Sequence, residues 1–277
     1  MHDPRVPESL EGWSVLHQMF RIRWDAWRAL ADGERAQRAA ATVETLAAMP
    51  QGEQGATALT TLLGHKGDVM LIHFRRDFDA LQAAQLAIAR CPLAAYLEPT
   101  SSYVSIVELG MYEMTAQIHG RLAEKGLALG SPEFEKAFDG ELEEQRRRVT
   151  GRLFQEVPAR RHVCFYPMNK RRGEHKNWYA VPFEERARMM RDHGAIGRHY
   201  AGSVNQIISG SIGFDDWEWG VDLFADDPLV FKKLIYEMRF DEVSAWYAEF
   251  GAFYIGLQFA AAQLPRLLEG EVPSLGR

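Results

Sequence analysis

The sequence predicts an α+β protein made of two halves that share one order of elements, strand–helix–strand–strand–helix–strand. Short apolar segments of strand length alternate with Ala- and Leu-rich segments of helix length, and the same order returns after about residue 160. Each half therefore corresponds to a ferredoxin-like unit. Such a unit leaves one sheet face open, so we expect the two sheets to pack together as an α+β barrel of the dimeric type, with the helices outside.

In the first half, a turn signal between two apolar strands and a helix stop before a proline are the clearest local features. Gly64-His-Lys-Gly-Asp68 is typical of a hairpin turn, and Cys91-Pro92 ends a helix. We expect strands over residues 12–20, 58–63, 69–74 and 103–109, and helices over residues 24–47 and 77–90.

In the second half, Pro182 at the first turn and Gly194 just past the last turn mark the ends of one helix. The expected strands are 162–166, 206–212, 217–224 and 252–258, and the expected helices are 182–193, 226–240 and a tail over 261–268. Residues 111–160 break the pattern and are interpreted as a linker with helices and a mobile loop. The predicted organisation is a first half over 1–157, with the helical linker from about 111 to 157, and a second half over 158–277.

Composition and charge argue against some classes of binding partner. The chain has 277 residues, is 47% hydrophobic and 25% charged, and carries a net charge of −6, which argues against a nucleic-acid binder. No apolar run reaches the roughly 20 residues that span a bilayer. The polar start lacks the apolar stretch of a secretory signal. Cys91 and Cys164 form no CxxC motif, so we expect two reduced thiols in a cytoplasmic protein without membrane or nucleic-acid partners.

Positive charge is concentrated between residues 160 and 198, where ten Lys and Arg face four acids. In an acidic protein this surplus favours a site for an anionic ligand, and the alternative is a solvated basic face.

Four residues of this region could carry chemistry. Tyr166 offers a redox-capable phenol at the end of a strand, and Lys170 follows in a basic loop that could reach carboxylates. His193 has two interpretations: it complements the dipole at a helix end, or it is the single protein ligand of a five-coordinate haem iron. Gln206, at a strand start, can only exchange hydrogen bonds. No HExxH, GxSxG elbow or P-loop is present.

These residues lie in runs that resemble a known family. YPMNKRRGEHKNWY, RDHGAIGRHYAG, GSIGFDDWEWGVDLFADD and KKLIYEMRFDEVSAWYAEFG are similar to the coproheme decarboxylases, the hydrogen-peroxide-dependent haem synthases of the chlorite dismutase-like superfamily. EGWSVLHQMF, DAWRAL and SYVSIVEL extend the resemblance more loosely into the first half. The resemblance implies an α+β barrel assembled as a homopentamer.

It also implies an activity: decarboxylation of the propionates at positions 2 and 4 of iron-coproporphyrin III (coproheme) to vinyl groups, giving haem b. Hydrogen peroxide is the oxidant and a tyrosyl radical the reacting group, and the step ends coproporphyrin-dependent haem biosynthesis. Coproheme would thus be substrate and redox cofactor at once, and a coproporphyrin ferrochelatase a transient partner.

Carried over by position, Tyr166 matches the catalytic tyrosine and His193 the iron ligand. Gln206 matches the distal residue, where chlorite dismutases carry Arg, and indicates the Firmicutes-type branch. Lys170 matches a catalytic and propionate-binding residue. The other positions implied to contact the porphyrin are Arg152, fourteen residues before Tyr166, Tyr112, Pro167, Met168, Asn169, Arg198 and Ser244. The sequence departs from the family between residues 115 and 150.

Two alternatives stay open at this point. The chain could be a haem peroxidase or chlorite dismutase-like protein, against which the lack of a distal Arg or His argues. It could also be a haem carrier without chemistry, which a Tyr166→Phe substitution would leave unaffected.

Overall fold

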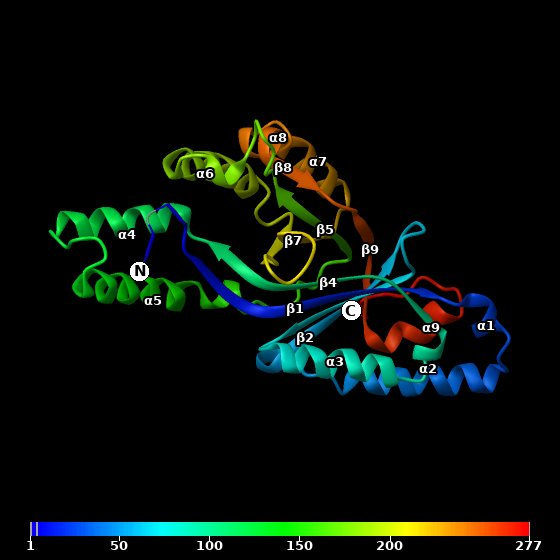
Figure 1. Cartoon of the computed structure of the whole chain (residues 1–277). Helices are drawn as coiled ribbons and strands as arrows, with labels where there is room; N and C mark the ends of the chain where they lie inside the picture. The colour runs from blue at the N-terminus through cyan, green and yellow to red at the C-terminus, as the bar shows by residue number, and fades with distance from the viewer. Residues whose placement is uncertain (1, 4, 277) are drawn as a thin grey trace.

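The computed structural model describes residues 2–3 and 5–276, and its nine described strands form one continuous sheet that closes into a barrel (Figure 1). The strands are β1 (Ser9–Ile22), β2 (Gly55–Leu62), β3 (Val69–Arg75), β4 (Leu97–Gly110), β5 (His162–Lys170), β6 (Asn205–Gly210), β7 (Trp219–Ala225), β8 (Ala248–Phe250) and β9 (Tyr254–Phe259). The α-helices are α1 (Trp24–Arg28), α2 (Asp32–Ala47), α3 (Phe78–Arg90), α4 (Tyr112–Glu124), α5 (Pro132–Leu153), α6 (Phe183–His199), α7 (Leu229–Met238), α8 (Glu242–Tyr247) and α9 (Leu264–Leu268).

The strand order confirms the predicted fold class. The first half contributes neighbours β4-β1-β3-β2, and the second half contributes β6-β7-β5-β9, which is the ferredoxin-like order in each case. Strand β4 pairs with β6 and β2 pairs with β9, so both seams between the halves are hydrogen-bonded. The two sheets are thus two parts of one closed barrel. Strand β8 pairs with the end of β5, next to β9.

One seam depends on a glycine. Gly256 of β9 pairs with Leu62 of β2, and a Cβ at this position would collide with the Thr61 carbonyl oxygen. The two backbones can approach here only because the side chain is absent.

Side chains alternate across the barrel wall, as strand geometry requires. In β5, Val163 and Phe165 belong to the buried cluster inside the barrel, whereas Cys164 and Tyr166 belong to a cluster packed against α7 on the outside. Helices α2, α3 and α9 cover the outer face of the first half, and α6, α7 and α8 lie over the second half (Figure 1).

The structure corrects several sequence-based boundaries. The helix expected over residues 24–47 is two helices, α1 and α2, interrupted at Ala29–Ala31. Strand β5 does not end at Tyr166 but runs to Lys170, because β8 supplies partners for Met168 to Lys170. Residues 248–250 and the short helix α8 were not anticipated.

The largest correction concerns α6. It does not stop at His193: it continues to His199, with Gly194 inside it. The interpretation of His193 as a residue at a helix end is therefore wrong. The segment expected to be a linker with helices does contain helices, α4 and α5, but they pack together on a core of their own formed by Ile118, Leu122, Phe134 and Phe138.

Within the described part of the chain, no helix is both long and apolar enough to cross a membrane.

Candidate functional site

The outer face of the second half brings the predicted residues together. Register places Gln206 beside Leu223 and Cys164 in one row, and Ile208 beside Val221 and Tyr166 in the next. The side chains on this face are largely apolar, and Tyr166 lies among them.

The two halves differ in how fully a helix covers this face. In the first half, Leu46 of α2 is buried against Leu59 and Leu71 of the sheet. In the second half, the buried residues of α6 are Arg186 and Met189, and Met189 packs with Trp178 and Val243 rather than on the strands. Residues 193–197 of α6 are all half-buried, and Ile208 keeps 39% of its surface exposed. Part of this apolar face thus remains open beside α6.

Tyr166 is a buried phenol without a hydrogen-bonding partner. Its ring stacks on Phe253 at 4.6 Å between centroids, and among the residues described its hydroxyl makes no hydrogen bond. Burial raises the pKa of Tyr166, and the Arg239 guanidinium opposes that shift. The phenol therefore stays protonated at neutral pH.

Lys170, which ends the same strand, is a buried ammonium whose positive charge is only weakly balanced by its neighbours. Its Nζ lies 4.9 Å from the centre of the Trp178 ring, and no hydrogen bond or ion pair of Nζ occurs within the described structure. Burial lowers the pKa of Lys170 to about 8, against the opposing charges of Asp241 and Glu218. A cation in this condition would be stabilised by an anionic ligand.

The rest of the basic loop is already paired. Arg171 Nε lies 3.4 Å from Glu249 and Arg172 Nε lies 3.6 Å from Glu218. Within this basic loop, Lys170 is therefore the cation without a described carboxylate partner. Outside the loop, Arg239 also lacks one, and its guanidinium lies 5.0 Å from the centre of the Phe250 ring.

His193 is held from one side by a buried carboxylate. Its Nδ1 lies 2.8 Å from Asp241 Oδ2, and the Asp241 side chain is only 5% exposed. Asp241 also accepts hydrogen bonds from the Ser244 backbone N–H at 2.9 Å and the Ser244 hydroxyl at 3.1 Å, so it caps α8. Burial alone would raise the pKa of Asp241, but the bonds from His193 and Ser244 lower it.

This contact fixes the imidazole. Because Nδ1 faces a carboxylate, it is the nitrogen that carries the proton in the neutral ring, and in that tautomer the Nε2 lone pair is free. Nε2 makes no hydrogen bond or ion pair within the described residues. Within the same residues no group of three His, Cys, Asp or Glu is arranged to hold a metal ion, so any iron here would depend on this one protein nitrogen.

The other residues that were predicted to contact the porphyrin do not all lie on the same face. Tyr112 packs edge-on against Trp178 at 6.3 Å, which joins it to Lys170. Met168 packs on the Tyr166 face, whereas Asn169 accepts a bond from the Glu218 N–H, and Pro167 contacts the Gly251 segment.

The two arginines are less engaged. Arg198 is exposed on α6, with its guanidinium 3.3 Å from where a Gly194 Cβ would lie. Arg152 is exposed on the last turn of α5 and makes no ion pair with a described residue, and its role at the porphyrin stays a prediction.

Sequence reasoning missed Asp241, Arg239 and Trp178 as parts of the site. Asp241 precedes Glu242-Val-Ser244 as a helix cap would, which is a readable local signal. Its bond to His193, 48 residues away, has no sequence signature.

Comparison with known proteins identifies the family. The sequence model of chlorite dismutases matches residues 35–259. The chain belongs to the chlorite dismutase family. Curated members named as putative heme-binding proteins occur in Natronomonas pharaonis, at 45% identity over 98% of this chain and 43% of that protein, and in Haloquadratum walsbyi, at 42% identity over 96% and 48%. The chain thus spans just under half the length of these curated relatives.

Solved structures of the family agree with the barrel. A structure described as a novel heme-binding protein from Thermus thermophilus superposes with a TM-score of 0.80 and 39% identity, covering 97% of this chain and all (100%) of that one. A chlorite dismutase mutant from Candidatus Nitrospira defluvii superposes with a TM-score of 0.70 at 17% identity over 94% and 96% of the two chains, and supports the fold alone.

Proposed function

We propose that this chain binds coproheme and converts its propionates at positions 2 and 4 to vinyl groups with hydrogen peroxide, giving haem b. The observation that carries the proposal is the arrangement of one imidazole oriented by Asp241, one unpartnered phenol and one buried cation around a partly open apolar face. The names of the relatives as heme-binding proteins support the choice of an iron porphyrin.

The residues fit such a ligand. The planar ring of a porphyrin suits the apolar rows that contain Ile208 and Val221, and its iron needs the single nitrogen that His193 leaves available. Coproporphyrin carries four carboxylates, for which Lys170, Arg239 and Arg198 are cations without a described carboxylate partner.

In this proposal the iron porphyrin and the residues of the chain have different chemical roles. The iron porphyrin, when bound, supplies the redox equivalents that peroxide delivers. Tyr166, whose hydroxyl has no hydrogen bond among the described residues, gives up its phenolic hydrogen as a proton and an electron, and the resulting phenoxyl takes a hydrogen atom from the β-carbon of a propionate. Lys170 would hold the carboxylate while the carbon–carbon bond to carbon dioxide breaks, and the electron left by this cleavage would be taken up by the second of the two oxidising equivalents that peroxide supplies. For each propionate the balance is R–CH2CH2COOH + H2O2 → R–CH=CH2 + CO2 + 2 H2O.

Gln206 favours this reaction over chlorite dismutation. It lies on the same face as Tyr166 and carries no charge, whereas the resemblance implies an Arg at this position in chlorite dismutases. The proposal extends to a cytoplasmic enzyme that acts as a homopentamer and receives coproheme from a ferrochelatase. The Firmicutes-type assignment stays a prediction, since the two curated relatives described above come from other organisms.

A second candidate, haem binding without catalysis, is favoured by the relatives, whose names describe binding only. The two differ at Tyr166. In the decarboxylase, Tyr166→Phe abolishes the conversion of bound iron-coproporphyrin and leaves its binding unchanged; Tyr236→Phe, at a 64% exposed tyrosine, is the matched control. Equal product from wild type and Tyr166→Phe would refute the role of Tyr166, and no product from wild type would favour the carrier.

A further inference from the structure

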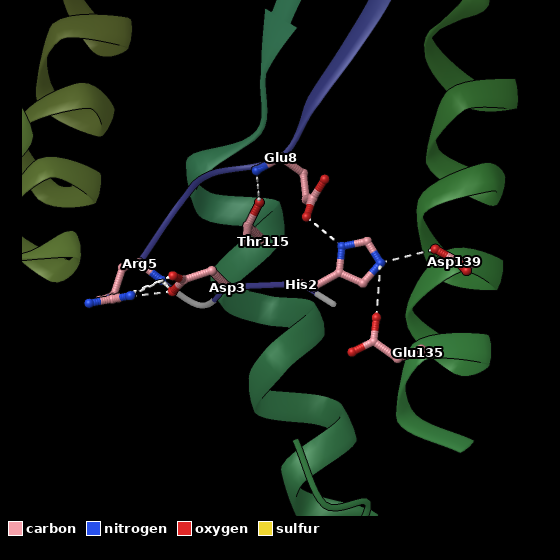
Figure 2. A network of polar contacts seen from close by, with 7 residues as sticks. All are labelled: His2, Asp3, Arg5, Glu8, Thr115, Glu135 and Asp139. Atoms are coloured by element: carbon pink, nitrogen blue, oxygen red, sulfur yellow. Dashed lines mark hydrogen bonds and ion pairs between the residues drawn. The ribbon is translucent and has the colours of Figure 1, made fainter. Parts of the chain in front are cut away.

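His2 lies between α4 and α5, and its ring nitrogens face the carboxylates of Glu8 and Asp139 (Figure 2). The His2 ring stacks on Phe138 of α5 with centroids 4.0 Å apart. Its Nδ1 lies 2.6 Å from Glu8 Oε1, and its Nε2 lies 3.0 Å from Asp139 Oδ1 and 3.8 Å from Glu135 Oε2. Both ring nitrogens thus face carboxylate oxygens.

Only one protonation state satisfies this geometry. A neutral imidazole donates one hydrogen bond and must turn a lone pair toward the other carboxylate, whereas the imidazolium donates from both nitrogens. Burial alone would lower the pKa of His2, but the bonds and charges of Glu8, Asp139 and Glu135 outweigh it and raise the pKa.

The surrounding charges support the same conclusion. From α4, His119 approaches Phe138 at 4.9 Å, and burial and the His2 charge lower the pKa of His119, which disfavours its charged form. Within the segment, Asp3 is paired with Arg5 at 2.7 Å. Neither His119 nor Arg5 is therefore placed to take the carboxylates from His2.

The same segment reaches the candidate site. The Glu8 N–H donates to Thr115 Oγ1 at 2.9 Å, and the Glu8 carbonyl accepts from the Met111 N–H, one residue before Tyr112. The Arg5 carbonyl accepts from Arg186 of α6, whose guanidinium lies 5.8 Å from the Tyr112 ring. Residues 5–8 thus join the helix that bears Tyr112 to the helix that bears His193.

We propose that residues 2–3 and 5–8 form a strap that is closed when His2 is protonated, holding Tyr112 in place between α4 and α6, and that detaches from α4 and α5 when His2 loses its proton. For a histidine whose pKa is raised in the closed state, the stabilisation is complete below the ordinary pKa of about 6.5 and disappears as pH rises through the higher value. The strap is therefore closed in acid and opens toward alkaline pH. This inference does not depend on which ligand the site takes.

The test compares the full chain with His2→Gln, Glu8→Gln and the control His65→Gln, at an exposed histidine in the β2–β3 turn. Hydrogen exchange, corrected for the intrinsic pH dependence, is followed in peptides covering residues 5–12 and 112–124 between pH 6 and 9. Protection of both regions in wild type and His65→Gln should fall together as pH rises. In His2→Gln and Glu8→Gln, exchange should be faster by on the order of tenfold already at pH 6, the effect of losing a charge-assisted hydrogen bond.

A second readout guards against a variant that disturbs folding. The His2 imidazole signal, identified as the one missing in His2→Gln, should titrate above pH 6.5 in wild type and at lower pH in Glu8→Gln. Protection that does not change with pH in wild type, or a His2 signal that titrates at or below 6.5, would overturn the proposal.

Discussion

Asp241 is the carboxylate on which the candidate site depends, so Asp241→Ala should be far more damaging than the loss of an ordinary helix cap. It removes two interactions at once. The cap on the Ser244 N–H contributes about 1 kcal/mol. The bond between His193 and a 5% exposed carboxylate contributes about 1.5–3 kcal/mol, the range for charged hydrogen bonds. The free energy of unfolding should therefore fall by roughly 2.5–4 kcal/mol.

The matched control is Asp77→Ala. Asp77 caps α3 in the same way, through the Ala80 N–H at 2.7 Å, but it is exposed and makes no contact with a histidine. Its removal should cost about 1 kcal/mol. Denaturant unfolding monitored by circular dichroism measures both, and for a chain of this size each kcal/mol lowers Tm by roughly 2–4 °C. Equal losses in the two variants would refute the argument that the His193–Asp241 contact stabilises the site. The Asp241 variant should also bind iron-coproporphyrin about 10–100-fold more weakly.

Three further predictions follow from the geometry. Tyr166→Phe should change the free energy of unfolding by less than about 1 kcal/mol, because the hydroxyl lacks a described partner; a larger loss in calorimetry would show that the hydroxyl is bonded after all. Affinity for iron-coproporphyrin should decline as pH rises above about 8, because Lys170 loses its proton there. The Lys170→Met variant should not show this decline, whereas the control variant Lys176→Met should. If absorbance titrations of Lys170→Met still show the decline, the assignment of Lys170 is wrong. Gly256→Ala should destabilise the barrel by about 1–3 kcal/mol or more, because the new Cβ meets the Thr61 carbonyl. The control Gly120→Ala, at an open position of α4, should instead stabilise the protein by about 0.5–1 kcal/mol. Equal denaturation midpoints for the two variants would contradict this account of the β2–β9 seam.

The sequence was sufficient for the fold class because each half repeats its pattern. The alternation in β5, with Val163 and Phe165 inward and Tyr166 outward, follows from strand period alone. The barrel was expected, but the strands that pair across its seams could not be predicted, because the β4–β6 and β2–β9 seams join residues far apart in the chain.

Helix ends were predicted less well where glycine was taken as a stop. Gly194 is inside α6, since the helix gains packing from Ile196 and Tyr200 beyond it, and tertiary contacts outweigh the cost of an interior glycine. Lys170 was expected in a loop, yet β8 pairs with it and makes it part of the strand.

Part of the candidate site could be predicted from the sequence. Tyr166, Lys170 and His193 were singled out from the sequence, and the structure places Tyr166 and Lys170 on one strand and links His193 to Lys170 through Asp241, whose charge acts on the lysine. The basic loop that contains Arg171 and Arg172 was expected to reach carboxylates of a ligand, but Glu249 of β8 and Glu218, just before β7, pair with these two arginines. Such pairing depends on strand register, which local sequence does not encode.

The most direct test of the proposed function is the mass of the products that form when peroxide is titrated into the protein loaded with iron-coproporphyrin III. The proposal predicts two successive losses, each of one carbon dioxide and two hydrogens, ending at haem b, in wild type but not in Tyr166→Phe. Bleaching of the porphyrin without vinyl products would contradict the decarboxylase, and would leave a chlorite dismutase family member that binds its ligand without this chemistry.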